Sequence, residues 1–428
     1  MTCTGDIRGD VTPGLLTFGD LEMADLRVAI VHDRLTEHGG AEKVLAEIVG
    51  LWPHADVYTP IASGNAVRPP LKSVRSTWLS SAYRISGCRS HAPLLPMVPR
   101  TLRKLPLRGR YDIVLISHFA FATQAALAAD CPTVAYVHSP ARWAWDPAFR
   151  AQEAGGMAGR AFLHNLGRMA RQNETRAASA LTHVVANSTA VAGRIADWWG
   201  RPSTVVHPPV DIDRFAVDET VAREDFLLIA GRQVPYKRTD LAIRAAKRAG
   251  TRLVVIGDGR HRTALDNLAG NETTFLGAVP HDTLVEMFQR CRAVLMPGVE
   301  DFGIVPVEAM ACGTPILAVN SGGALDYIKP GVTGEFIDYG TDNEVIADLA
   351  DKMSSIDFAT FDPAEIRAFA ESFSPRFFRS RMADIARLAI NGQLEYGRGP
   401  NALTRTMPVA GLRAIDYGSR PMGALANE

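Results

Sequence analysis

The segment from Pro297 to Pro315, PGVEDFGIVPVEAMACGTP, combines acidic side chains with the signals of a helix start. Pro306 is typical of a first helical turn, and Gly313 of a helix end. The backbone N–H groups of Gly303, Ile304 and Val305 would then project from the helix N-terminus, where the helix dipole also favours negative charge. We therefore predict that this segment binds a phosphate.

Two carboxylates flank that predicted helix start. Glu300 lies in the loop before the helix and Glu308 within its first turns, so both can face one ligand. Ionised carboxylates accept hydrogen bonds, and hydroxyl groups are their obvious donors. The simpler interpretation is that Glu308 only favours the helix dipole and Glu300 is a solvated loop residue. The flanking pattern favours a ligand that carries both phosphate and hydroxyl groups.

The run GRQVPYKRTD, from Gly231 to Asp240, places two cations directly after a predicted buried strand. Ligands of open α/β sheets bind at the carboxyl ends of the strands. Arg232 can fork onto phosphate oxygens and Lys237 supplies a compact charge, so together they would stabilise a departing diphosphate without a metal. A solvated basic loop is the alternative interpretation.

The run HGGAE, from His38 to Glu42, follows the first predicted strand and opens a helix. Gly39 and Gly40 would let a ligand approach the backbone closely, although a glycine pair before a helix is more often a plain turn.

The run YVHSPARWAWD places His138 at the end of another predicted strand. There it could hydrogen-bond a sugar hydroxyl or a developing charge, and a structural role is the alternative.

Two further patterns are weak indicators. Asp211-Ile212-Asp213 resembles a metal-binding DxD motif, but it follows Pro208-Pro209 and is better explained as a turn and helix cap. Gly257-Asp258-Gly259 lacks the complete glycine pattern of a dinucleotide-binding loop. We therefore predict neither a metal nor a bound cofactor.

Short β-branched runs alternate with helical stretches in two series. Continuous apolar strands of this kind indicate parallel sheets covered on both faces, so the fold class is α/β with two Rossmann-like domains. The first series comprises residues 27–32, 112–117, 133–138, 182–188 and 203–207, and the second comprises 226–231, 252–257, 273–277, 293–298 and 315–319.

The domain boundaries follow from these series. We expect a disordered extension over 1–25, one domain over 26–209, a second over 210–374, a helix crossing back over 375–392 and a weakly ordered tail over 393–428. The stiff Pro208-Pro209 pair is the predicted linker. Because the first strand starts shortly after Met23, translation is expected to start at Met23.

The composition is that of a soluble globular protein. The chain has 428 residues, 47% of them hydrophobic, and 46 basic residues balance 46 acidic ones, so net charge predicts no nucleic-acid partner. The five cysteines are scattered and form no CxxC pair, which argues against a zinc site or disulfide framework and favours the cytoplasm. No signal peptide is recognisable near the N-terminus.

The segment 68–110 is strongly basic, because no acidic residue occurs between Asp56 and Asp112. Its positive charges, with Trp78, Tyr83 and the run LLPMVP between them, could dock on an anionic membrane. A solvated basic face is the equal alternative. The ten cations are Arg68, Lys72, Arg75, Arg84, Arg89, Arg100, Arg103, Lys104, Arg108 and Arg110.

Together these motifs resemble glycosyltransferase family 4, retaining enzymes of the GT-B fold with two facing Rossmann-like domains. The resemblance spans residues 26 to 392 and rests on the GGAE loop, the GR-x4-K loop, the E-x7-E segment with its FGIV core and the His138 strand end. It implies a C-terminal helix that returns to the first domain, and no need for a divalent metal.

The resemblance also implies residue roles. Arg232 and Lys237 would bind the donor diphosphate, together with Gly39, Gly40 and the segment Phe302, Gly303, Ile304 and Val305. Glu308 would bind the ribose, Glu300 the transferred sugar, and His138 would assist that sugar. The expected catalytic set is His138, Glu300, Arg232 and Lys237.

VHDRLTEHGGAEKVL together with YVHSPARWAWD is most similar to bacterial mannosyltransferases that build lipid-linked polysaccharides. The implied reaction moves mannose from GDP-mannose to a glycan or lipid-linked glycan, at the inner face of the cell membrane. A UDP-hexose or another nucleotide sugar is the alternative donor. A glycosidase, a nucleotide-sugar epimerase and a non-catalytic sugar-nucleotide sensor are the alternative functions.

Overall fold

The computed structural model describes residues 25–394 apart from 38, 72, 89, 148 and 151–155. Met23, His38 and nearly all of the predicted extension and tail lie outside the described residues. In the described part of the chain, no helix combines the length and apolar character needed to cross a membrane.

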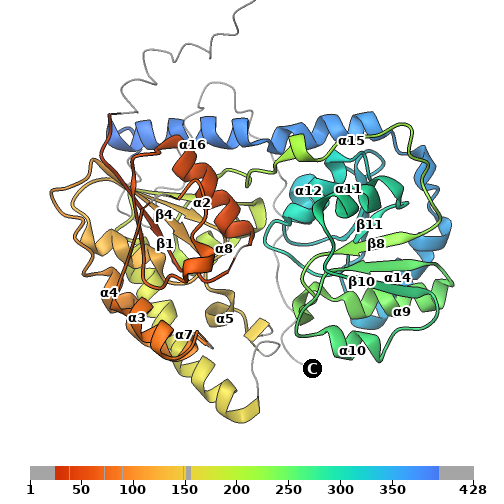
Figure 1. Cartoon of the computed structure of the whole chain (residues 1–428), viewed down its shortest axis with the longest axis horizontal. Coiled ribbons are helices and arrows are strands. Elements are labelled where there is room, and N and C mark those ends of the chain that lie inside the picture. The colour runs from red at the N-terminus through yellow and green to blue at the C-terminus, as the bar shows by residue number, and fades with distance from the viewer. Residues whose placement is uncertain are drawn as a thin grey trace, which may run out of the picture. The chain divides into compact units, whose positions relative to one another are not determined.

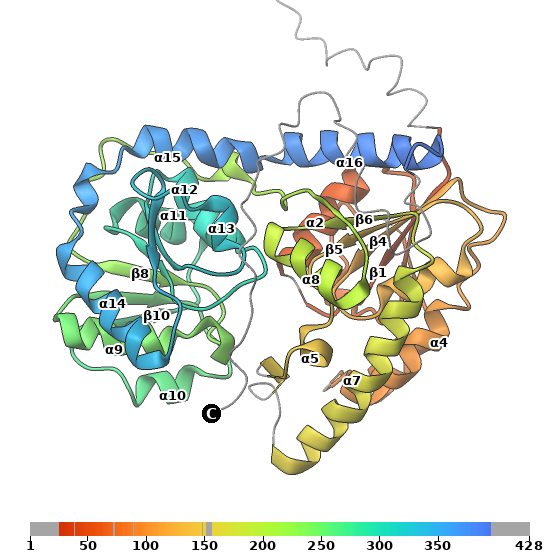
Figure 2. The ribbon, with the colours of Figure 1, turned by 180° about the vertical axis from the view of Figure 1, so that it is seen from behind.

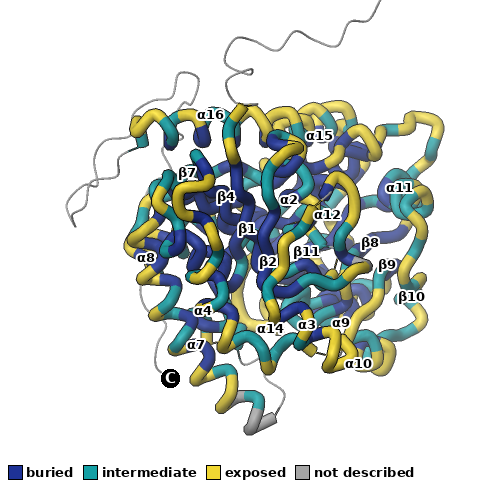
Figure 3. Tube along the Cα trace, turned by 60° about the vertical axis from the view of Figure 1, so that its left-hand side comes forward, coloured by how far each residue is buried: buried dark blue, intermediate teal, exposed yellow. Residues whose placement is uncertain are grey.

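The first half of the chain forms a seven-stranded parallel sheet, in the order β3-β2-β1-β4-β5-β6-β7. Every residue of β1 and β4 is buried, as expected for strands covered on both faces (Figure 1, Figure 3). The strands are β1 Val28–His32, β2 Asp56–Thr59, β3 Val74–Ser76, β4 Ile113–His118, β5 Thr133–Val137, β6 His183–Ala186 and β7 Thr204–Val205. The helices are α2 Gly40–Leu51, α3 Trp78–Ile85, α4 Val98–Leu102, α5 Arg142–Trp145, α7 Gly156–Ala178 and α8 Thr189–Trp199. We call this part the N-lobe.

The second half forms a six-stranded parallel sheet, in the order β10-β9-β8-β11-β12-β13, which we call the C-lobe with its helices. The strands are β8 Leu227–Ala230, β9 Leu253–Ile256, β10 Thr273–Gly277, β11 Val294–Met296, β12 Ile316–Val319 and β13 Gly334–Ile337. The helices are α9 Thr239–Ala249, α10 Arg262–Asp266, α11 His281–Arg290, α12 Ile304–Ala311, α13 Ala324–Tyr327, α14 Asp342–Ser355 and α15 Pro363–Ala370. In both sheets the strand order reverses beside the first strand, where Rossmann-like sheets bind ligands.

The predicted α/β class with two parallel sheets is confirmed. Strands β2, β3 and β13 were not predicted from the sequence. These are short strands, and two of them contain residues that weaken a strand pattern: β2 begins with Asp56 and β13 with Gly334.

The last helix, α16 Pro375–Ile390, returns to the N-lobe as predicted (Figure 2). Phe378, Met382 and Ile385 are buried in one cluster with Leu45 and Ile48 of α2. The ring of Phe378 meets that of Tyr136 edge-on, with centroids 5.4 Å apart. Phe377, beside Phe378 in the sequence, is 56% exposed.

The chain passes between the lobes at two points that lie side by side. The first follows β7 through Pro208-Pro209, and the second leads into α16. The amide of Val210 donates to the carbonyl of Phe373 over 2.8 Å, so the two passages are hydrogen-bonded to each other. The exact domain boundaries at 209/210 and 374/375 stay predictions.

Candidate functional site

The loop after β8 carries the two predicted phosphate-binding cations in different settings. Arg232 is 64% exposed, whereas Lys237, in a 3-10 turn over Pro235–Lys237, is only 14% exposed. Lys237 Nζ lies 2.5 Å from Glu300 Oε1. Burial alone would lower the pKa of Lys237, but the charge of Glu300 outweighs it and raises that pKa above its ordinary value. Lys237 is therefore a permanent cation.

Glycines hold the Glu300 loop in place. A Cβ at Gly298 would lie 2.4 Å from the carbonyl oxygen of Tyr236, so the loop packs directly on the turn that carries Lys237. On its other side, the amide of Gly323 donates to the carbonyl of Glu300 over 2.9 Å, and a Cβ at Gly322 would lie 2.4 Å from that same oxygen. This supporting loop was not predicted from the sequence. Its signal is the glycine pair Gly322-Gly323, which two residues separate from the end of the buried strand β12.

Helix α12 starts at Ile304, and Gly303 before it has φ +98°, a conformation that favours glycine. The amides of Gly303 to Val305 thus belong to the first turn, as predicted. Glu308 is 7% exposed on the same helix and accepts a hydrogen bond from Lys43 Nζ of the N-lobe at 2.7 Å.

Phe302 has a different surrounding from the other predicted donor contacts. Its ring is 3% exposed and packs against His207, Tyr327 and Phe373. The ring supports the loop, so any donor contact at this position has to come from the backbone.

The glycine loop of the N-lobe touches α12. A Cβ added at Gly40 would lie 3.0 Å from Ile304 Cδ1, and the amide of Gly39 donates to Glu42 Oε2 over 2.8 Å. Together with the Lys43–Glu308 pair, this contact places the predicted residues of the two lobes against each other.

His138 follows β5 and is half-buried. Its Nε2 lies 2.8 Å from Ser117 Oγ, and its ring meets those of Tyr136 and Phe119 edge-on. Burial, reinforced by the neighbouring His32, lowers the pKa of His138 to about 3. The side chain is therefore neutral at physiological pH, so one ring nitrogen can donate a hydrogen bond and the other can accept one.

The loop after His138 is anchored by Glu174 of α7, a fully buried carboxylate. Glu174 accepts from the amide of Ala141 at 3.0 Å and from Trp145 Nε1 at 2.5 Å, and it lies 2.9 Å from His118 Nε2. Glu174 could not be predicted as a site residue, because a single Glu inside a long helix gives no signal.

An ion-pair cluster beside Glu300 was also missed. Asp301 of the C-lobe pairs with Arg142 at 3.4 Å and with Arg194, both of the N-lobe, and its carbonyl accepts from Ser188. The residue next to Glu300 is thus held by the opposite lobe.

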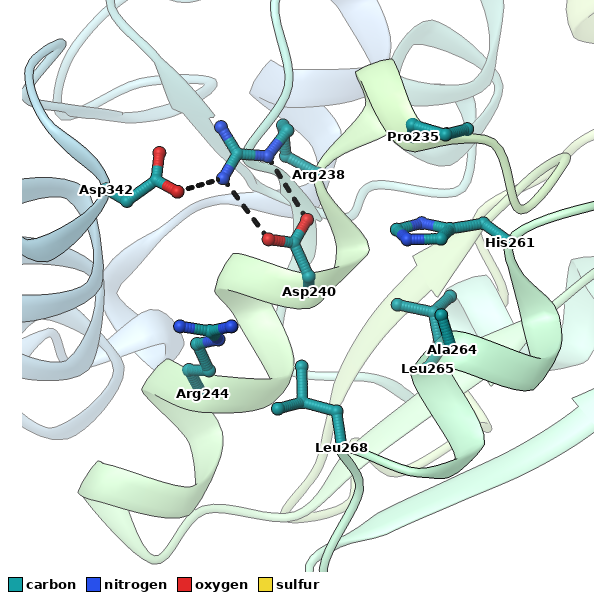
Figure 4. Close-up of a pocket in the computed structure, with 9 residues that line it drawn as sticks. All are labelled: Pro235, Arg238, Asp240, Arg244, His261, Ala264, Leu265, Leu268 and Asp342. Carbon is teal, nitrogen blue, oxygen red and sulfur yellow. Dashed lines mark hydrogen bonds and ion pairs between the residues drawn. The ribbon is translucent and has the colours of Figure 1, made fainter. Parts of the chain in front are cut away.

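A cavity of about 460 Å³ lies behind the cationic loop, between α9 and α10 (Figure 4). Its main cation, Arg238, is paired with Asp240 and Asp342 over 3.1 and 2.6 Å. The lining holds two arginines, Arg238 and Arg244, and two carboxylates, Asp240 and Asp342, so these charges balance and the cavity offers no net positive charge to a phosphate.

The two sequence patterns that were weak indicators, Asp211–Asp213 and Gly257–Gly259, lie in a turn and a loop. Asp211 precedes the 3-10 turn Ile212–Arg214, and a Cβ at Gly257 would overlap the carbonyl oxygen of Gly231, so the Gly257–Gly259 loop packs under the cationic loop. Among the described residues, His, Cys, Asp and Glu form no cluster able to hold a metal ion.

In the basic segment, Arg75 pairs with Asp56, Arg103 binds Gln124 and Asn173, and Arg84 donates to Ser81. Six cations are exposed, namely Arg68, Arg84, Arg100, Lys104, Arg108 and Arg110. Trp78 and Ile85 of α3 and Met97 are 57%, 87% and 39% exposed among them. Lys72 and Arg89 lie outside the described residues.

Two family models match the chain in succession. Residues 38–214 match Glycosyltransferase Family 4, and residues 212–359 match Glycosyl transferases group 1. Similar curated proteins include the D-inositol 3-phosphate glycosyltransferases of Mycobacterium sp. (strain KMS) and Mycobacterium tuberculosis (strain F11). Each is 36% identical, over 155 and 154 residues respectively. The matches span 31% of this chain and only about a third, 35% and 32%, of those relatives.

Solved structures resemble nearly the whole described chain. Anabaena HepE in complex with UDP-glucose has a TM-score of 0.63 at 20% identity, covering 84% of this chain and 99% of that one. Sucrose-phosphate synthase from Thermosynechococcus elongatus also has a TM-score of 0.63, at 15% identity, covering 86% and 100%. These likenesses confirm the predicted GT-B fold.

Proposed function

Because the chain belongs to the glycosyltransferases whose family 4 and group 1 models it matches in succession, we propose that it transfers a hexose from a nucleoside-diphosphate sugar to a glycan or lipid-linked glycan. The observation that carries this proposal is the convergence of Arg232, Lys237, Glu300 and Glu308 around the start of α12, against the glycine loop of the N-lobe. Cations and helix amides suit a diphosphate, and carboxylates suit hydroxyl groups.

The residue roles follow from charge and position. Lys237, Arg232 and the amides of Gly303 to Val305 bind the diphosphate and stabilise it as it leaves. Glu300, oriented by Lys237, accepts hydrogen bonds from the transferred sugar. Glu308 binds the ribose, whose hydroxyl replaces Lys43 at its carboxylate. No step of this scheme uses a metal ion.

The proposed chemistry retains the configuration at the anomeric carbon. The bond from that carbon to the diphosphate oxygen breaks, and a bond to the acceptor oxygen forms on the same face. The acceptor proton passes to the leaving phosphate. In this scheme Glu300 positions the sugar and is not a covalent nucleophile.

Two nucleotide sugars are the candidate donors. The resemblance of the VHDRLTEHGGAEKVL segment favours GDP-mannose, whereas HepE, similar in fold, was crystallised with UDP-glucose, which favours a UDP-hexose. A thermal-shift panel of GDP- and UDP-sugars separates them, because a ligand that binds the folded state raises the melting temperature. No shift with any sugar nucleotide or nucleoside diphosphate would contradict the proposal.

Product analysis tests the reaction class. A transferase yields a longer glycan plus nucleoside diphosphate, an epimerase yields an isomerised donor, and a sensor yields neither. Only the first outcome supports the proposal.

We further propose that the exposed part of the basic segment binds the anionic inner face of the cell membrane. Trp78 and Ile85 would enter the interface while Arg84, Arg100 and Lys104 meet lipid phosphates, each contributing about 1 kcal/mol. Flotation with anionic and neutral vesicles tests this proposal. Reversing Arg100 and Lys104 to Glu should abolish flotation, and equal recovery with both vesicle types would contradict it.

A further inference from the structure

A chain of hydrogen bonds runs from the glycine loop to His138 through the interior of the N-lobe. Glu42 Oε1 lies 3.5 Å from His32 Nε2, and His32 Nδ1 lies 3.0 Å from Ser117 Oγ. Ser117 Oγ in turn lies 2.8 Å from His138 Nε2. His32 and Ser117 are fully buried and Glu42 is 8% exposed, so neighbouring water does not replace these partners.

This chain of hydrogen bonds forms because β1 pairs with β4 in parallel, which places His32 opposite Ser117. His138 follows β5, the next strand in the sheet, and Glu42 lies in the first turn of α2. Four elements thus supply one member each.

The carboxylate of Glu42 determines which group donates and which accepts at each step of this hydrogen-bond chain. Burial by itself would raise the pKa of Glu42, but its hydrogen bonds with His32 and the Gly39 amide hold that pKa below the ordinary value, so Glu42 is ionised and can only accept. His32 then donates from Nε2 and accepts at Nδ1. Ser117 donates to His32 and accepts from Nε2–H of His138.

Nearby acidic groups do not compete for these donors. The carboxylate of Asp33 is saturated by the amides of residues 119–122, at 2.5 to 2.8 Å. Glu174 lies 2.9 Å from His118, which follows Ser117 in β4 and therefore points to the opposite face of the sheet. Among the described residues, His138 Nδ1 has no hydrogen-bond partner.

We propose that Glu42, His32 and Ser117 are positioning residues that fix His138 as the Nε2–H tautomer, leaving Nδ1 to accept a hydrogen bond from a hydroxyl of the transferred sugar. Only this last step rests on the proposed function. Since Glu42 also holds Gly39, the glycine loop that touches α12 and the histidine that faces the sugar form one network.

The donor-to-acceptor order of the hydrogen-bond chain can be reversed by replacing one carboxylate oxygen of Glu42 with an amide group. In Glu42→Gln, the side-chain carbonyl keeps the Gly39 contact and the amide group faces His32, so His32 accepts at Nε2 and donates from Nδ1. Ser117 then donates to His138 Nε2, and His138 takes the Nδ1–H form. Side-chain ¹⁵N shifts of the full-length protein, with His138 assigned by its loss in His138→Gln, measure the tautomer directly.

The expected spectra are Nε2–H for His138 in the parent protein, Nδ1–H in Glu42→Gln and a mixture in Ser117→Ala. Glu47→Gln is the same change at another carboxylate of α2, which pairs with Arg379 of α16 and lies outside this hydrogen-bond chain, so it should leave the parent tautomer. A parent Nδ1–H form, or one tautomer in all four proteins, would overturn the proposal. Ser117→Ala removes a single oxygen and serves if Glu42→Gln does not fold.

Kinetics with the donor test the last step. We expect Glu42→Gln to lower kcat about tenfold with donor KM changed less than about threefold, while Glu47→Gln keeps both values. Equal effects of the two changes would overturn the sugar contact. Absence of transferase activity in the parent would instead contradict the proposed function, and the tautomer measurement would still decide the network.

Discussion

The two lobes build their sides of the candidate site in opposite ways. The C-lobe side consists of charges: Arg232, Lys237 and Glu300 lie in loops after strands, and an ion pair joins the last two. On the N-lobe side, the neutral His138 is held by the buried Ser117 and His32, and the one charge of this network, Glu42, lies at its far end. Charge suits the part of a donor that leaves as an anion, and fixed neutral hydrogen bonds suit the orientation of a sugar.

The largest expected effect is on the charged side. Glu300→Gln keeps the size of the side chain but removes the charge that pairs with Lys237, so turnover should fall about 100- to 1,000-fold. Steady-state transfer assays measure it. Glu286→Gln, which changes an exposed carboxylate of α11, is the control. Near-normal turnover in Glu300→Gln would refute the assigned role.

Replacing either cation, Lys237 or Arg232, should weaken donor binding, but only the replacement of Lys237 should strongly destabilise the protein. Lys237→Ala and Arg232→Ala should each weaken donor binding at least about tenfold. Lys237→Ala should also cost about 3 kcal/mol of unfolding free energy, because Glu300 is left without its buried partner. Arg232→Ala should cost less than about 1 kcal/mol, since its pair with Glu37 is exposed. Titration calorimetry and denaturant unfolding measure the two effects, and equal destabilisation would contradict the comparison.

The contact between the lobes gives a smaller effect. Gly40→Ala places a methyl group 3.0 Å from Ile304 Cδ1, so the lobes have to separate slightly and donor KM should rise about three- to tenfold. Gly50→Ala, on the same helix with nothing within 4 Å of the added atom, should leave KM unchanged and stabilise the protein by about 0.5 kcal/mol. Similar KM values for both variants would show that the lobes do not close at Gly40.

The smallest effect is a pH dependence of stability on the neutral side. The pKa of His138 is lowered to about 3, below the ordinary value near 6.5. Between these values the unfolded chain binds a proton that the folded protein does not, so stability falls as pH falls below about 6.5. His138→Gln should remove about 1 kcal/mol per pH unit of that loss. Urea unfolding at pH 5 and pH 6.5 measures it, and identical pH slopes in the parent and His138→Gln would contradict a lowered pKa of His138.

The difference between the lobes also explains what the sequence could predict. Arg232, Lys237 and Glu300 were identified because charges in the loop after an apolar strand are conspicuous, and Glu308 because it follows the signals of a helix start. Ser117 and His32 were not, because they lie 85 residues apart and meet only through the register of β1 with β4. Lys43, Arg142 and Arg194 were missed as site residues because their partners belong to the other lobe, and no local pattern encodes that contact. The two-sheet fold was predictable, since it rests on local strand patterns.

The return of α16 has a consequence for biosynthesis. The N-lobe cluster contains Phe378, Met382 and Ile385, so it is assembled from the beginning and the end of the described chain, with the C-lobe between them. A ribosome that makes the chain from its N-terminus exposes every strand of the C-lobe sheet before it supplies α16. The C-lobe is therefore able to complete its core during translation, while this cluster of the lobe that was synthesised first must wait for the last helix.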